Sequence, residues 1–186
     1  MMEKGRLRKI WWTVVGLYLA VVYMTLGVAR GLWDVLNEFL GGRAIGFIYL
    51  VGIVAVLALF VYMVFKKKER SPGRYLLFLL FVSIFFILSK LAIYPVEKFH
   101  LLEYGGLSFL VYNALKTELD RYDIRLYILG SLICVGAGVV DEVIQLALPN
   151  RVFDYRDIIL NAVSSVTAFM VIRFNILDHP QKALSR

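Results

Sequence analysis

The chain has 186 residues, of which 60% are hydrophobic and only 19% are charged. A soluble domain is roughly 45–50% apolar and about 25% charged, because its surface has to be hydrated. The composition therefore excludes a soluble globule, a disordered chain and a nucleic-acid-binding domain, and it predicts a protein whose solvent is lipid. A net charge of +7 is typical of the basic excess on cytoplasmic loops of membrane proteins. The single cysteine, Cys134, excludes an intrachain disulfide.

Six apolar runs follow one another, each close to the roughly 20 residues that a helix needs to cross the hydrocarbon core. They cover residues 10–29, 45–65, 75–93, 99–115, 126–148 and 158–174. We predict an all-α, polytopic transmembrane bundle with about six membrane-spanning helices. The first run follows basic residues, as a signal peptide does. It exceeds the roughly 7–15 residues of a secretory core, and no small-residue cleavage site follows, so we expect a retained helix.

The connection between the first two runs, residues 31–43, has its own helical pattern. Leu32, Leu36 and Leu40 recur at helical spacing, with polar residues between them. This pattern predicts a short amphipathic helix in the membrane interface, anchored by Trp33. An ordinary capped loop is the alternative.

The basic residues divide unevenly between the two sides of this six-helix arrangement. With the N-terminus inside, 15 of the 21 Lys and Arg residues lie on the cytoplasmic side. The other six are Arg30, Arg43, Lys90, Lys98, Arg151 and Arg156. Because cytoplasmic loops are enriched in Lys and Arg, we predict a multi-pass protein of the cytoplasmic (inner) membrane with both termini cytoplasmic.

Polar residues concentrate in the last three predicted helices, at the level of the outer leaflet. Ionisable residues inside a membrane are costly, at least about 2.5 kcal/mol each at its centre, so they usually face the bundle interior. Small residues such as Gly138 let a neighbouring helix approach and cover them. We therefore expect one outward-facing polar site. Its members are Glu97, His100, Glu103, Tyr104, Asp141, Glu142, Gln145, Arg151, Asp157 and Asn161.

Two strings in this region, EKFHLLEYGGL and DEVIQLALPNRVFDYRDIILN, resemble the signature regions of VanZ-like membrane proteins. The spacing agrees from Glu97 and Lys98 to Asn161, and the resemblance covers roughly residues 79–174. Ile144 stands where many members have a second histidine, and Ser164 stands where a glycine is usual, which predicts slightly looser helix packing. The resemblance divides the chain into two N-terminal transmembrane helices with a basic loop (1–74), a four-helix VanZ-like core (75–177) and a short cytoplasmic tail (178–186).

The family is named for an accessory protein of glycopeptide resistance, so the resemblance implies a role in resistance of the teicoplanin type. Our main hypothesis is a site for a lipid-linked or anionic envelope component. In it, Lys98, His100 and Arg151 meet phosphate. Asp141, Glu142, Gln145 and Asn161 hydrogen-bond sugar or peptide groups. Glu97, Tyr104 and Asp157 are further substrate-binding residues.

Three other interpretations stay open. A membrane hydrolase or transferase would use His100 with Glu103 or Glu142 as an acid–base couple. The polar residues could instead only lock the helices together, or they could belong to a transporter, although the inner helix halves offer almost no polar path beyond Asn113. We assign no metal and no cofactor, expect membrane lipids and a lipid-linked precursor as partners with no nucleic acid, and leave the oligomeric state open.

Overall fold

The computed structural model describes residues 2–92, 97–149 and 153–177, which form helices and short connections without any β-strand. The helices are α1 (Met2–Thr25), α2 (Ala29–Phe39), α3 (Ala44–Val61), α4 (Pro72–Leu91), α5 (Glu97–Leu115), α6 (Ile124–Ala147) and α7 (Tyr155–Val171). Two π-helical turns, η1 (Tyr62–Lys66) and η2 (Ile172–Ile176), continue α3 and α7. The all-α membrane bundle predicted from composition is confirmed.

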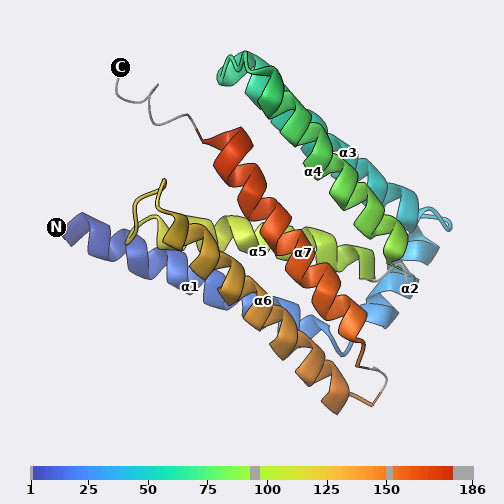
Figure 1. Ribbon diagram of the computed structural model, residues 1–186. Coiled ribbons are helices and arrows are strands. Elements are labelled where there is room, and N and C mark those ends of the chain that lie inside the picture. The colour runs from blue at the N-terminus through green and yellow to red at the C-terminus, as the bar shows by residue number, and fades with distance from the viewer. Residues whose placement is uncertain (1, 93–96, 150–152, 178–186) are drawn as a thin grey trace.

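Five of these helices are long and apolar enough to cross a membrane, namely α1, α3 with η1, α4, α6 and α7 with η2. The sixth predicted span, α5, is not among them, because His100, Glu103 and Asn113 interrupt its apolar sequence. Its position explains the difference. Helices α1, α6 and α7 pack around α5, as Figure 1 shows, and 12 of its 19 residues are buried. Protein rather than lipid therefore surrounds its polar side chains.

Helices α3 and α4 lie on the other side of α7 from α1 and α6 (Figure 1). α3 is apolar on all sides, and only Ala44 and Ile48 of its 18 residues are buried. A helix with no polar stripe has no face that must avoid hydrocarbon. The rest of α3 is therefore free to face lipid.

Small residues let the C-terminal helices approach closely. A Cβ atom added at Gly130 of α6 would lie 2.3 Å from the ring of Phe169 on α7, so only glycine fits there. Ser164 of α7 is fully buried and donates a hydrogen bond of 3.0 Å to the Leu101 carbonyl of α5. Its hydroxyl is therefore satisfied by the facing backbone, and the looser packing expected from this serine stays a prediction.

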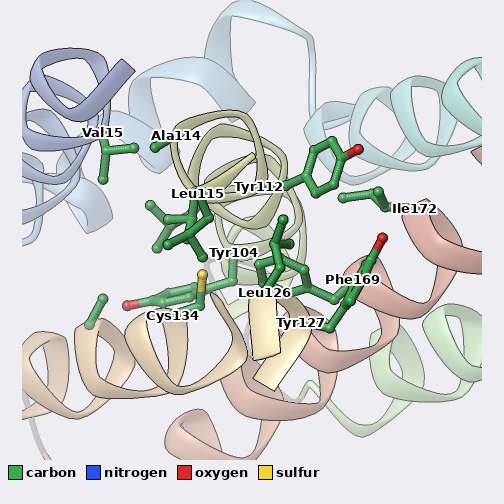
Figure 2. Packing of buried hydrophobic residues seen from close by; sticks show 13 residues of the cluster. Val15, Tyr104, Tyr112, Ala114, Leu115, Leu126, Tyr127, Cys134, Phe169 and Ile172 are labelled. Carbon is green, nitrogen blue, oxygen red and sulfur yellow. The ribbon is translucent and has the colours of Figure 1, made fainter. Parts of the chain in front are cut away.

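The apolar core lies where α5, α6 and α7 meet, with α1 covering one side. Figure 2 shows Phe169 and Tyr127 next to Leu126, while Val15 of α1 approaches Leu115 of α5. The rings of Tyr127 and Phe169 meet edge to face, with centroids 6.4 Å apart. This core holds α5 in place between the helices that carry the remaining polar residues.

A polar lock joins the loop after η1 to the end of η2. Lys67 donates to the carbonyls of Asn175 and Leu177 at 2.6 and 2.7 Å, and Arg74 contacts Glu69 at 2.7 Å. Burial alone would raise the pKa of the Glu69 carboxyl, but backbone hydrogen bonds from Ser71 and Arg70 and the charges of Arg74 and Lys67 lower it below its usual 4.5. The α3–α4 pair is thereby tied to α7 at this end.

The predicted interfacial helix is present as α2. Its exposed side chains include Val35 and Phe39, and none of its residues is buried. Trp33 turns instead toward α5, where its ring meets Phe99 edge to face with centroids 5.9 Å apart. Gly41 and Gly42 follow with positive φ angles of 58° and 80°, a conformation that favours glycine, and they turn the chain into α3.

Candidate functional site

Polar side chains from α5 and α6 form a connected network near the start of α5. His100 Nδ1 lies 3.1 Å from Glu103 Oε2 and 3.7 Å from Asp141 Oδ2. Tyr104 donates its hydroxyl hydrogen to Asp141 Oδ2 at 3.1 Å. The i, i+3 and i, i+4 spacing of His100, Glu103 and Tyr104 places all three beside Asp141 of the neighbouring helix.

The network continues along α6 and reaches the beginning of α7. Gln145 Nε2 donates to Asp141 Oδ1 at 3.3 Å and to Glu142 Oε1 at 2.7 Å. The other oxygen of Glu142 accepts the backbone N–H of Asp154 at 3.0 Å, just before α7. We call the six connected residues the acid–histidine cluster: His100, Glu103, Tyr104, Asp141, Glu142 and Gln145.

The cluster is enclosed by protein. Asp141 and Glu142 have no exposed surface, and Glu103 is its accessible carboxyl group, with 31% of its side chain exposed. Gly138 makes this enclosure feasible, since a Cβ there would lie 3.1 Å from the Asn161 Cβ. The convergence expected from three separate stretches of sequence is thus present for these residues.

Of the two basic residues predicted to contact phosphate, Lys98 and Arg151, the structure describes only Lys98. Lys98 is buried, and its ammonium group donates to the carbonyls of Ser89 and Ala92 at 2.8 and 2.7 Å, where it caps the end of α4. Arg151 lies outside the described residues. Glu97 is buried at the first turn of α5. A phosphate contact by Lys98 would therefore require its ammonium to leave these carbonyls, and that role stays a prediction.

Asp157 and Asn161 occupy the same face of α7, one turn apart. Both are buried, and Asn161 has no exposed surface. Oδ1 of Asp157 and both polar atoms of the Asn161 side chain have no hydrogen-bond partner among the residues that the structure describes. Buried polar atoms without partners cost free energy, so water or a ligand group is the usual explanation. This face adds unused hydrogen-bonding capacity next to Tyr104 and Gly138.

Sequence analysis missed the contribution of α1 to the site. Tyr18 donates to the Glu103 carbonyl and Tyr23 to the Ala137 carbonyl, both at 2.9 Å. These bonds fix α1 against α5 and α6 around the cluster. The available signal was two tyrosines within an otherwise apolar run, because a buried tyrosine hydroxyl usually finds a partner.

A pocket of about 190 Å³ opens beside the cluster. Its polar lining comes from Thr25, His100 and Glu103, while its apolar lining comes from Leu26, Ala29, Leu32, Trp33, Leu36 and Phe99. Helix α2 therefore covers a space that reaches two members of the acid–histidine cluster. The sequence predicted both the amphipathic helix and the cluster, but not that they share this pocket.

The chemistry of the cluster is dominated by hydrogen-bond acceptors. Carboxyl oxygens of Glu103 and Asp141 lie 3.1 and 3.7 Å from a single imidazole, and Gln145 links Asp141 to the Glu142 carboxyl. Such a set accepts hydrogen bonds from hydroxyl, amide or ammonium groups and can orient an imidazole for proton transfer. Among the described residues, no group of three His, Cys, Asp or Glu side chains is arranged to hold a metal ion.

A family model described as VanZ/LLP1 matches residues 15–177. No curated protein and no solved structure matches the chain. The family match begins well before residue 79, where the motif resemblance starts, and it includes α2, α3 and the C-terminal part of α1. The extent predicted from the motifs was too short, because both signature strings lie in the C-terminal half of the chain.

Proposed function

Since the chain belongs to the VanZ/LLP1 family, we propose that this membrane protein binds the headgroup of a lipid-linked cell-envelope component at the acid–histidine cluster. The observation that carries the proposal is a connected set of acceptors: the accessible Glu103 and the buried Asp141 lie beside His100, and Gln145 connects Asp141 to the buried Glu142. Interhelical polar contacts in membranes contribute only about 0.6 kcal/mol on average. That gain is small compared with the cost of burying several carboxyl groups, which favours a role beyond helix association.

The headgroup that fits best carries hydrogen-bond donors. Hydroxyl and amide groups of amino sugars and peptides, or a primary ammonium group, would pair with the carboxyl oxygens and with Asn161. A phosphate group would depend on His100 and on Arg151. With the N-terminus cytoplasmic, as the distribution of basic residues predicts, the cluster faces the outer leaflet, where envelope precursors are consumed. Binding there would shield the target of a glycopeptide antibiotic of the teicoplanin type.

The direct test is retention of lipids by the purified protein in nanodiscs, measured by native mass spectrometry. The probes are a polyprenyl-linked amino-sugar precursor, phosphatidylethanolamine and phosphatidylglycerol. We expect the wild-type protein to retain the precursor or phosphatidylethanolamine selectively. Asp141→Asn and Glu142→Gln should each reduce that retention roughly tenfold, the effect of about 1.4 kcal/mol.

Glu38→Gln is the matched control, because Glu38 is an exposed carboxylate of α2 outside the cluster. It should retain lipid as the wild-type protein does. Retention that is equal in wild type and both cluster variants, with all proteins folded, would refute the proposed binding. A parallel growth assay should show that expression raises survival in teicoplanin, and that the cluster variants lose this gain.

One contact favours a second candidate, an acyl or glycosyl hydrolase or transferase acting on an envelope lipid. The Nδ1 atom of His100 lies 3.1 Å from a carboxyl oxygen of Glu103, the arrangement by which a carboxylate orients an imidazole. The other ring nitrogen would then accept a proton from an attacking hydroxyl or water, and Glu142 would act as acid. Incubation with the same lipids should yield a new product by mass spectrometry, and His100→Ala should abolish it. Absence of any product from wild type would eliminate this candidate.

A further inference from the structure

The pocket under α2 differs in character from the acid–histidine cluster that it adjoins. Its lining is mainly apolar, from Leu26 just after α1 through Leu32 and Trp33 of α2 to Phe99 of α5. A buried water needs two to four polar partners, and this lining offers few. The pocket of about 190 Å³ is smaller than the roughly 300–1,000 Å³ that holds a whole drug-sized ligand. Its size and polarity suit a segment of one hydrocarbon chain.

Helix α2 covers the pocket without closing it. Ala29, Leu32, Trp33 and Leu36 form one stripe at i, i+3, i+4 and i+7, and all four line the pocket. Even so, α2 has no buried residue, and Leu32 remains 55% exposed. An apolar stripe above an unfilled space lacks partner atoms for dispersion contacts. A chain lying in the pocket would supply those atoms, which the described residues do not supply.

The polar part of the lining separates this pocket from a surface that merely touches bulk lipid. His100 and Glu103 belong both to the pocket and to the cluster, and they lie 3.1 Å apart. Glu103 is the accessible carboxyl group of the cluster, while Asp141 behind it is fully buried. A molecule in the pocket therefore meets the cluster through acceptors. Charge complementarity calls for donors next to the chain.

We infer that the pocket holds the hydrocarbon chain of an amphiphile whose adjoining headgroup donates N–H or O–H hydrogen bonds to His100 and Glu103. This inference rests on the proposed function and narrows its ligand to a chain-bearing lipid with donor groups close to the chain. Trp33 and Phe99, whose rings meet edge to face, form one wall of the pocket against which the chain lies, and Glu103 distinguishes a headgroup with an ammonium N–H donor from one without it.

Photo-crosslinking in nanodiscs tests the inference with two matched probes. One is lysophosphatidylethanolamine with a diazirine midway along its single chain, and the other is the lysophosphatidylcholine with the same chain. The two headgroups differ only at the nitrogen, where choline has three methyl groups in place of the three ammonium hydrogens. We expect the ethanolamine probe to label the peptides that contain Leu32, Trp33 and Phe99, and to label them roughly fivefold more than the choline probe does. Glu103→Gln should remove this preference.

Two variants fill the pocket, and one matched control does not. Ala29→Trp and Leu36→Trp each place a bulky side chain in the lining, and either should reduce labelling at Phe99 roughly fivefold or more. Val35→Trp adds the same side chain on the exposed face of α2, where Val35 is 66% exposed, and should leave labelling unchanged. Thermal unfolding of each variant shows which of them are folded. The labelling of the folded Trp variants is then compared with that of Val35→Trp.

The results separate this inference from the proposed function. The chain pocket is overturned if neither Ala29→Trp nor Leu36→Trp lowers the labelling. It is also overturned if Val35→Trp lowers the labelling as much as those two variants do. Equal labelling by both probes, with both Trp variants effective, overturns the donor headgroup while leaving a chain site. A third outcome is that Asp141→Asn loses precursor retention while neither Trp variant changes probe labelling. That result would support binding at the acid–histidine cluster and contradict the chain pocket.

Discussion

Helices α3 and α5 are of similar length but show opposite relations between polarity and burial. α3 belongs to the most hydrophobic candidate span, with a mean hydropathy of 2.8, yet only two of its 18 residues are buried. α5 carries Glu97, His100 and Glu103, and 12 of its 19 residues are buried. In lipid, apolar side chains gain little from leaving the solvent, whereas polar ones gain much. The proposed site therefore lies on the helix whose sequence is least like that of a membrane-spanning helix.

The largest difference is expected from one glycine substitution made in each region. Gly130→Ala puts a Cβ against the Phe169 ring, whereas Gly52→Ala in α3 meets no atom within 4 Å. Overpacking at Gly130 should destabilise the protein by about 1–3 kcal/mol. Gly52→Ala should be neutral or stabilising by up to about 1 kcal/mol through helix propensity. Thermal unfolding in detergent measures both, and equal shifts would mean that the core is not tightly packed at Gly130.

A carboxyl group within the cluster should matter more than an exposed one. Asp141→Ala leaves the Tyr104 hydroxyl without its acceptor and removes one of the two acceptors of the Gln145 amide, which should cost about 2 kcal/mol of stability. Asp34→Ala on exposed α2 should change stability by less than about 0.5 kcal/mol. Unfolding midpoints check the pair. If Asp141→Ala proves as benign as the control, the hydrogen-bond network has no energetic importance.

The comparison also shows how much the sequence could predict. Hydrophobic runs predicted the helices, since a bilayer demands long apolar stretches. Glu103 and Asp141 were expected to converge because each lies in the outer half of its own predicted helix. The direction of Lys98 could not be predicted, because its ammonium chooses between a ligand and the carbonyls of Ser89 and Ala92. The contacts of Tyr18 and Tyr23 depend on how α1 crosses α5, which a helical pattern alone does not specify.

A smaller effect is expected at Lys98, which lies in α5 and donates to the end of α4. Lys98→Met keeps the volume of the side chain but removes the donor that caps the end of α4. The variant should lose about 1 kcal/mol of stability. Its lipid retention should match that of the wild type, because the ammonium donates to the Ser89 and Ala92 carbonyls and to no member of the cluster that the structure describes. Reduced retention of phosphatidylglycerol in a stable Lys98→Met protein would instead show that this lysine contacts phosphate.

The smallest effect should depend on pH and involve the polar lock at the opposite end. The pKa of Glu69 is lowered in the folded protein, so its stabilisation is fully present above the usual value of 4.5. It is lost as the pH falls through the lower, folded value. The unfolding temperature of the wild type should decline in this acidic range, and Glu69→Gln should lack that part of the decline. Parallel pH profiles for the two proteins would contradict the assignment.

The central claim is that the enclosed polar helices form a binding site and not only a helix lock. The most direct measurement is an electron cryomicroscopy structure of the protein in nanodiscs containing lysophosphatidylethanolamine. We expect density for a hydrocarbon chain between α2 and Phe99 that continues into a headgroup at His100 and Glu103. A well-resolved map with the α2 pocket collapsed, and with no density beyond the protein at these two side chains, would contradict it.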